Sequence, residues 1–285
     1  MKIYTAKAYA KINLALNIKG ILEDGYHEID TVILPINLHD TLEISIFPNT
    51  VKESFITCDA FDFNESKNNI CQNAIQALRE KCGFKEHFRI HIYKRIPVAG
   101  GLAGGSADAA ALLKAINRIL KLGLSLDELA EIGAKLGSDV PFCIYNQAAR
   151  CYNKGEKMQF IDSKFRNYVL IVKPGSGLKT ENVYKKCDEF EHKNCDIDEL
   201  IEGLENDDRD KILKNMRNDL YAASNALLPE IGELIGYFKS LGFTYSQMTG
   251  SGSCIYILND TSRPLYKVMK ELTAKGYSCE LTKII

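Results

Sequence analysis

Apolar and polar residues alternate over residues 8–18, close to the start of the chain. Successive side chains of a strand point to opposite faces, so this period of two predicts a strand with one buried face. Lys11 and Asn13 fall on the other, polar face. The same alternation over residues 41–47 predicts a second strand, and the Asp-Gly pair at 24–25 marks a turn between the two.

A helical pattern follows in the middle of the chain. Residues 106–120 place apolar side chains three and four positions apart, which predicts a helix with one apolar stripe. Ser125 and Glu128 have the spacing of a capping box, so another helix should begin there and end near Gly137. The other predicted elements are helices over 69–78, 231–241 and 265–275, a charged, exposed helical stretch over 187–219, and strands over 88–96, 168–172, 245–248 and 254–258.

This mixture of helices and strands predicts an α/β fold. A chain of 285 residues is too long for one small core and suits two domains of ordinary size. Length and composition place the boundary near residue 160, giving an amino-terminal domain over 1–160 and a carboxyl-terminal domain over 161–285.

The charge balance and the cysteines limit the partners of the chain. Lys plus Arg (36) nearly equals Asp plus Glu (37), so no overall field draws the protein to nucleic acid or to an anionic membrane. Lys7 and Lys11 interrupt the apolar residues at the start, which argues against a signal peptide, and no apolar run is long enough to span a bilayer. The nine cysteines show no metal-binding spacing and indicate reduced, mostly buried thiols. We therefore expect a cytoplasmic protein with no nucleic-acid and no membrane partner.

The most informative stretch is PVAGGLAGGS, residues 97–106, which links a predicted strand to a predicted helix. Glycines let the backbone approach a ligand, and the first N–H groups of a helix point outward at the positive end of its dipole. Together they predict a site for a di- or triphosphate. No Lys follows Gly105, so this is not a Walker loop, and the Gly-x-Gly-x-x-Gly spacing fails as well. The alternative is a tight strand-to-helix turn with Ser106 as the helix cap.

The loop resembles that of the GHMP kinases, which reads Pro-x-Gly-Gly-Gly-Leu-Gly-Gly-Gly-Ser-Ser. The chain departs from this pattern at Ala99 and Ala103, which should require an ordinary backbone there, and at Ala107, which lacks a hydroxyl. The resemblance implies ATP as the phosphoryl donor, accompanied by Mg²⁺, with Ser106 as the hydroxyl that contacts phosphate or metal. It implies that the ATP-binding residues of the loop are Pro97, Val98, Ala99, Gly100, Gly101, Leu102, Ala103, Gly104, Gly105, Ser106 and Ala107.

A second motif of the family is Gly-x-Asp-Val-Pro, which residues 137–141 resemble with Asp139 at its centre. On local sequence alone Asp139 would be the N-cap of a short helix. The resemblance implies that it is the general base for the attacking hydroxyl, with Lys11 as its partner. A neighbouring ammonium keeps a carboxylate ionised and eases deprotonation of a hydroxyl. Without the resemblance, Lys11 would be a solvated residue on the polar face of a strand.

The third family motif is matched by TGSGSC over residues 249–254, which on its own would be a hairpin turn. The resemblance implies that this loop lies near the transferring phosphate. Three motifs in the family order extend across most of the chain. They imply a GHMP kinase fold, with an amino-terminal domain like domain 2 of ribosomal protein S5 and a ferredoxin-like carboxyl-terminal domain.

The segment DGYH over residues 24–27 resembles one branch of the family, whose substrate is a polyol linked to cytidine diphosphate. A tyrosine can stack on a pyrimidine, and a histidine can hydrogen-bond its polar edge. In isolation the segment would be a turn with two amphipathic surface residues. The resemblance implies that the substrate-binding residues are Asn13, Tyr26, His27 and Tyr184, and that Asn69, Ile70 and Lys94 lie near the adenine pocket.

These observations predict a small-molecule kinase that acts as a monomer or weak homodimer. The alternatives are another GHMP kinase, of the homoserine or mevalonate type, and a non-catalytic member that binds a ligand or RNA. The DGYH segment speaks against the first, and the presence of both Lys11 and Asp139 speaks against the second.

Overall fold

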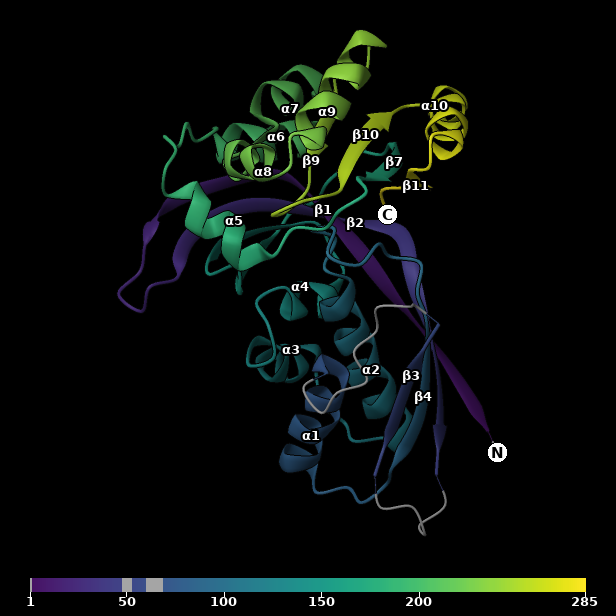
Figure 1. Ribbon diagram of the computed structural model, residues 1–285. Helices are drawn as coiled ribbons and strands as arrows, with labels where there is room; N and C mark the ends of the chain where they lie inside the picture. Colours follow the sequence, from purple (N-terminus) through teal and green to yellow (C-terminus); the bar gives the residue numbers. More distant parts are fainter. Residues whose placement is uncertain (1, 48–52, 60–68) are drawn as a thin grey trace. The chain divides into compact units, whose positions relative to one another are not determined.

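The computed structural model describes residues 2–47, 53–59 and 69–285 (Figure 1). The described residues form two compact units that alternate along the chain. Unit 1 takes its residues from Met1–Ala10, His39–Ile96 and Ala103–Asn146, and unit 2 from Lys11–Leu38, Pro97–Leu102 and Gln147–Ile285. The sequence boundary near residue 160 stays a prediction.

Two long strands, β1 (Ile3–Ile21) and β2 (His27–Ile46), contribute residues to both units. β1 contains the predicted strand over 8–18, and β2 contains all but the last residue of the strand predicted over 41–47. The prediction of a single buried face was wrong for β1, because Lys11 and Asn13 are only 4% and 3% exposed. Both polar side chains are enclosed, so β1 is an interior strand rather than a surface strand.

Unit 1 combines a short stretch of sheet with four helices. The end of β2 pairs antiparallel with β4 (Phe88–Tyr93), and β3 (Phe55–Cys58) lies parallel to β4. The helices gather on one side of β3 and β4 in Figure 1. They are α1 (Ile70–Cys82), α2 (Gly104–Leu120), α3 (Leu126–Ala134) and α4 (Val140–Tyr145). The predicted capping box is confirmed, since the Ser125 hydroxyl and the Glu128 carboxylate each accept the other's backbone N–H.

The alanine- and leucine-rich face of α2 is the main apolar surface of unit 1. Residues such as Ala109, Leu112 and Ile116 are fully buried on it. They recur three and four positions apart, as the predicted apolar stripe requires. Because this face packs against α1 and α4, the amino-terminal turn of α2 has a fixed place in the unit.

Unit 2 is built around an antiparallel sheet in the order β11-β7-β10-β9. Its strands are β7 (Tyr168–Lys173), β9 (Ser246–Met248), β10 (Ile255–Asn259) and β11 (Ser278–Lys283). In the same unit β1 pairs parallel with β8 (Arg217–Asn218), and β2 pairs with β5 (Ala149–Asn153), which pairs with β6 (Lys157–Phe160).

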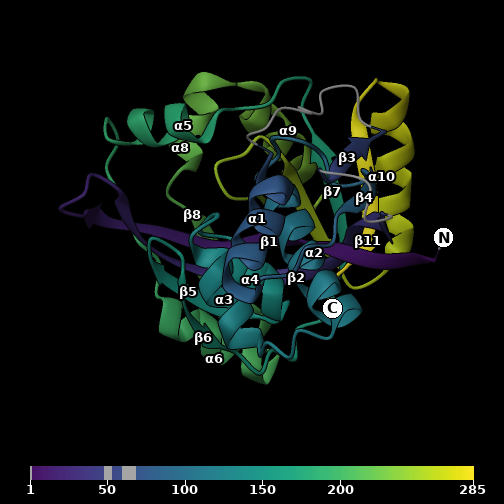
Figure 2. The same cartoon turned by 90° about the horizontal axis from the view of Figure 1, so that it is seen from below.

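The helices of unit 2 bury an apolar core that includes Leu170, Phe238 and Ile255. They are α5 (Thr180–Cys187), α6 (Ile197–Asn206), α7 (Arg209–Asn215), α8 (Tyr221–Leu227), α9 (Glu230–Ser240) and α10 (Ser262–Ala274). Figures 1 and 2 both show α10 alongside β11, and the two elements are in contact. The helical stretch predicted over 187–219 is interrupted, because residues 188–196 are not helical and residues 217–218 form strand β8. No helix of the described ranges is long and apolar enough to cross a membrane.

Candidate active site

Three of the seven residues in the loop over residues 97–103 have a left-handed backbone. Gly101 has φ +76°, and Ala99 and Ala103 have φ +54° and +59°. The expectation of an ordinary backbone at the two alanines was therefore wrong. An L-residue in this region costs about 1–2 kcal/mol. Such strain persists only where surrounding contacts impose it, and it concentrates at functional sites.

Gly100 and Gly101, in the middle of the loop, contact the third motif, residues 249–254. A Cβ added to Gly101 would overlap the carbonyl of Thr249, and one added to Gly100 would overlap the Cys254 sulfur. The Gly100 carbonyl accepts the Cys254 N–H at 3.2 Å, and the Gly101 carbonyl accepts the Thr249 hydroxyl at 3.3 Å. Within unit 2, the two glycine-rich segments thus pack backbone against backbone.

Lys11 and Asn13 lie where these two segments meet. The Lys11 ammonium donates to Asn13 Oδ1 at 2.7 Å and lies 3.3 Å from the position of a Cβ added to Gly250. The backbone N–H of Lys11 donates to the Leu102 carbonyl. Asn13 donates from its backbone to the Thr249 hydroxyl at 3.1 Å and from its side chain to the Thr31 hydroxyl at 2.9 Å. Lys11, Asn13, the loop residue Leu102 and Thr249 of the third motif are therefore neighbours in unit 2.

The first turn of α2 belongs to unit 1. The helix begins at Gly104 after Ala103, which provides no side-chain cap, and Ser106 lies inside the first turn. Ser106 as a simple helix cap was therefore a wrong alternative. A Cβ added to Gly137 would lie 3.9 Å from the Ser106 hydroxyl, which places that hydroxyl beside the second motif. The first N–H groups of α2 have no partner within the helix and suit an anion.

Asp139 occupies the N-cap position of α4, with Pro141 in the first turn. Its backbone is in the right-handed helical region (φ −82°, ψ −12°), and its side chain makes no capping hydrogen bond. The capping alternative therefore describes where Asp139 lies, but the carboxylate makes no hydrogen bond that caps α4. Asp139 belongs to unit 1 and Lys11 to unit 2, so their predicted pairing stays a prediction.

The predicted adenine-pocket residues all lie in unit 1. Asn69 caps α1 by accepting the Cys71 N–H at 2.8 Å, and Ile70 lies near the position of a Cβ on Gly105. The Lys94 ammonium donates to two buried carboxylates, Asp40 and, at 2.8 Å, Asp108. Sequence reasoning missed both aspartates. A charged residue within the apolar stripe of a predicted helix, as at position 108, was the available signal.

The structure brings two of the predicted cytosine-binding residues together. The rings of His27 and Tyr184 lie 4.9 Å apart, and His27 Nε2 lies 2.7 Å from a carboxylate oxygen of Asp188, which the sequence did not indicate. Tyr26 is 63% exposed, with the Lys154 ammonium 4.8 Å from its ring centroid. Cytosine recognition by these residues stays a prediction.

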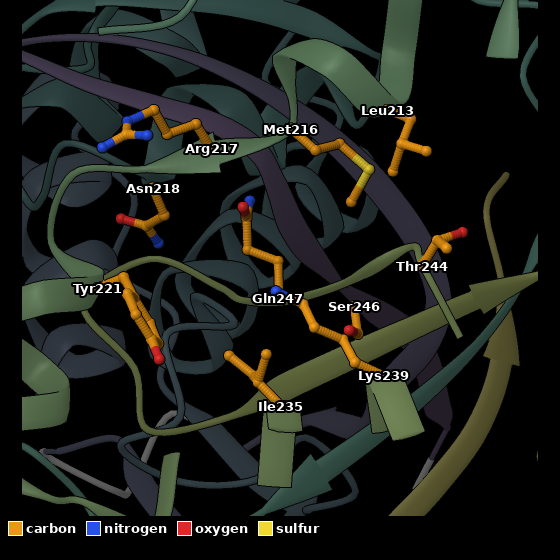
Figure 3. A pocket seen from close by; sticks show the side chains of 10 residues that line it. All are labelled: Leu213, Met216, Arg217, Asn218, Tyr221, Ile235, Lys239, Thr244, Ser246 and Gln247. Carbon is orange, nitrogen blue, oxygen red and sulfur yellow. The ribbon is translucent and has the colours of Figure 1, made fainter. Parts of the chain in front are cut away.

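A cavity of about 360 Å³ lies elsewhere in unit 2 (Figure 3). None of the predicted site residues lines it. It is lined by Leu213, Met216, Arg217, Asn218, Tyr221, Ile235, Lys239, Thr244, Ser246 and Gln247. Two of these residues hydrogen-bond the backbone next to the candidate site. Asn218 donates to the Met248 and Gly250 carbonyls, at the third motif, and Gln247 donates to the Leu14 carbonyl, next to Asn13 on β1.

Comparison with known proteins assigns the class of this arrangement. The model of the GHMP kinases N terminal domain matches residues 69–147, and that of the GHMP kinases C terminal matches residues 200–278. A crystal structure of homoserine kinase from Cytophaga hutchinsonii, at 17% identity, shares the fold with a TM-score of 0.73 over 99% of this chain and 94% of that one. The chain belongs to the GHMP kinases, and the expected two-domain GHMP fold is confirmed.

The particular branch follows from the curated relatives. The chain is 37% identical to the 4-diphosphocytidyl-2-C-methyl-D-erythritol kinase of Shouchella clausii, over 98% of this chain and 95% of the relative. It is 36% identical to the enzyme of that name from Clostridium tetani, over 93% and 95%. A crystal structure of 4-(cytidine 5'-diphospho)-2C-methyl-D-erythritol kinase matches with a TM-score of 0.82 and 26% identity over 99% of both chains.

Proposed function

We propose that the chain transfers the γ-phosphoryl group of ATP to the 2-hydroxyl of 4-diphosphocytidyl-2-C-methyl-D-erythritol. The products are the 2-phosphate and ADP, in the non-mevalonate route to isoprenoid precursors. The observation that carries the proposal is the full-length similarity to relatives named for this activity. The meeting of the phosphate loop and the third motif around Lys11 and Asn13 supports it from the structure.

The transfer is direct and in line, and the protein's task is to position groups and neutralise charge. The phosphate loop, residues 97–107, binds the triphosphate through its backbone N–H groups, which every residue of the loop except Pro97 carries. Asp139 accepts the proton of the attacking hydroxyl, while the Lys11 ammonium favours the ionised carboxylate and the developing alkoxide. The hydrogen bond from Lys11 to Asn13 fixes the direction of the ammonium.

Mg²⁺ would be held at this site mainly through the phosphates of ATP. In the described parts of the chain, no group of three or more His, Cys, Asp or Glu side chains could hold a metal ion. Mg²⁺ keeps several waters and is commonly held by substrate phosphates with few protein ligands. A site with few protein donors therefore fits a metal that is delivered by the nucleotide. The Ser106 hydroxyl is the protein group we assign to it. When bound, the ion neutralises phosphate charge.

The acceptor is recognised through its cytosine. Tyr26 and Tyr184 supply aromatic faces, and His27, oriented by Asp188, supplies a hydrogen bond to the polar edge of the base. A homoserine or mevalonate kinase has no need of such a pocket. The monomeric or weakly dimeric state and the cytoplasmic location stay predictions.

The test is ADP release with a panel of acceptors: the cytidine-linked methylerythritol, free methylerythritol, homoserine and mevalonate. Turnover with the cytidine-linked acceptor alone, with phosphorus NMR showing a new monoester on the methylerythritol unit, is the expected result. Turnover with homoserine or mevalonate instead would assign the chain to another GHMP specificity. The Asp139→Asn variant is the matched control for contaminating ATPase activity.

A further inference from the structure

Unit 1 contains a buried cluster of charges. It consists of Asp40 at the middle of β2, Lys94 just after β4, and Asp108 on α2; these three residues are named the buried triad. The Lys94 ammonium donates to one carboxylate oxygen of each aspartate. The side chains are 0%, 10% and 4% exposed in the order Asp40, Lys94, Asp108. Removing three charges from water costs several kcal/mol per ion before any pairing, so such a cluster needs a structural or functional reason.

Asp40 also binds the backbone that enters the phosphate loop. Its second oxygen, Oδ1, accepts the N–H groups of Arg95 and Ile96 at 2.6 and 2.8 Å. These are the last two residues before the loop begins at Pro97. One carboxylate therefore fixes both the Lys94 side chain and the path of the chain into the loop.

The other side of the triad touches the start of α2. A Cβ added to Gly104 would lie 3.4 Å from the Lys94 ammonium and 3.1 Å from the Ile96 side chain. Asp108 sits one turn further along the same helix. The triad thus brackets the turn whose free N–H groups are assigned to phosphate, from the end of β4 on one side and from within α2 on the other.

Burial and the neighbouring charges shift the pKa values within the triad. Burial raises the pKa of Asp108 to about 7, and Asp40 adds to the rise while Lys94 opposes it. Burial alone would lower the pKa of Lys94, but the two carboxylates outweigh it and the pKa is raised. The remaining oxygen of Asp108, Oδ1, is buried without a hydrogen-bond partner among the described residues. A buried oxygen without a hydrogen bond destabilises the ionised form of Asp108.

We infer that Asp40 and Asp108 are positioning residues for ATP: through Lys94 and the backbone of residues 95–96 they hold the first turn of α2 in the geometry that binds phosphate. The inference rests on the proposed function only in taking ATP as the ligand of that turn. It predicts that damage to the triad weakens ATP and leaves the cytidine-linked acceptor nearly unaffected. A small displacement of the N–H groups at the first turn of α2 is enough to weaken ATP binding, because the effect of misplacing a binding group rises steeply with the displacement.

The decisive variant is Asp40→Asn. Its single carbonyl oxygen can face the two backbone N–H groups or the ammonium, but the amide nitrogen then faces the other donor. Asp30→Asn is the matched control: Asp30 is also buried on β2 and pairs with a cation, Arg150, but lies in unit 2. We expect Asp40→Asn to raise the KM for ATP about tenfold with less than about a twofold change in the acceptor KM, and Asp30→Asn to change neither by more than about twofold.

Asp108→Leu keeps the inference testable if Asp40→Asn does not fold. It leaves a neutral Lys94–Asp40 pair and removes the tie to α2, so the KM for ATP should rise about threefold or more at an unchanged acceptor KM. An unchanged KM for ATP in whichever variant folds overturns the inference, as does an equal rise with Asp30→Asn. A wild-type chain that phosphorylates none of the acceptors would overturn the proposed function and not the inference. The inference could still be tested, because calorimetry with ATP alone compares the ATP affinities of the variants.

Discussion

At the scale of single residues, the proposed general base Asp139 gives the most direct test of the mechanism. Asp139→Asn keeps the size of the side chain and removes the proton acceptor, so turnover should fall by about 10²–10⁴-fold. ATP binding should change little, because the phosphate loop is intact. Steady-state turnover at saturating substrates, with ATP affinity by calorimetry, measures the two effects. Near-normal turnover would leave Asp139 with a structural role only.

A second single-residue variant, Tyr26→Ala, tests whether this tyrosine recognises cytosine. Its ring is mostly exposed, so Tyr26→Ala removes little packing energy in the free protein. Loss of base stacking should weaken the cytidine-linked acceptor by about 1–3 kcal/mol and leave the KM for ATP unchanged. Tyr266→Ala on α10 removes another exposed tyrosine and serves as the control. A rise in the KM for ATP alone would move Tyr26 to the donor pocket.

The glycines of the loop show how one element constrains another. Gly101 and Gly123 have nearly the same left-handed backbone, φ +76° and +77°, but only Gly101 faces another segment closely. Gly123→Ala should cost about 1–2 kcal/mol for the backbone alone. Gly101→Ala must in addition displace the carbonyl of Thr249, so it should cost clearly more and raise the KM for ATP.

Urea unfolding of both glycine variants separates the two contributions. Equal losses of stability would mean that the contact between the loop and the third motif yields easily. An unchanged KM for ATP in a folded Gly101→Ala variant would separate the shape of this loop from phosphate binding.

Sequence reasoning predicted elements with a strong local pattern and missed those that depend on distant partners. The stripe of α2 and the capping box of α3 were found because three- and four-residue spacing expresses them directly. The edge strand β11 was missed because its pattern, SCELTK, is mainly polar and its pairing partner β7 is about a hundred positions away. The left-handed backbone of Ala99 was missed for the same reason, since Ala99 lies against Gly177, which is distant in the sequence.

The candidate site divides in the same way. Motif residues such as Lys11 could be proposed from spacing, but their burial could not, because it needs Thr249 and the loop to close over β1. The two aspartates of the buried triad carry no motif. Only the folded chain shows that they share one ammonium.

At the scale of the whole molecule, the buried triad should make stability depend on pH. The pKa of Asp108 is raised from 3.8 to about 7, so the folded protein keeps a proton that the unfolded chain releases. Stability from this group is therefore greatest at low pH and falls as the pH rises toward about 7. The groups facing Asp108 are Lys94, Asp40 and the Cys71 thiol, whose pKa burial raises well above its ordinary value.

Asp108→Asn removes this titration. The free energy of unfolding of the variant, relative to wild type, should rise steadily between about pH 5 and pH 7 and then level off. Urea denaturation across that range measures it, with Glu131→Gln on the exposed side of α3 as the control for a lost carboxylate. Parallel curves for wild type and Asp108→Asn would mean that Asp108 does not hold its proton on folding.

The bonds that Asn13 makes with Thr249 and Tyr256 join residues 236 and 243 positions apart. On the ribosome, a chain grows at about 5–20 residues per second, so the residues of β1 are synthesised roughly tens of seconds before these partners. Throughout that interval the polar face of β1 has no partner in the third motif. A chain released before residue 249 can therefore never enclose Lys11 as the full protein does, and we expect such truncated chains to depend on chaperones and to be inactive.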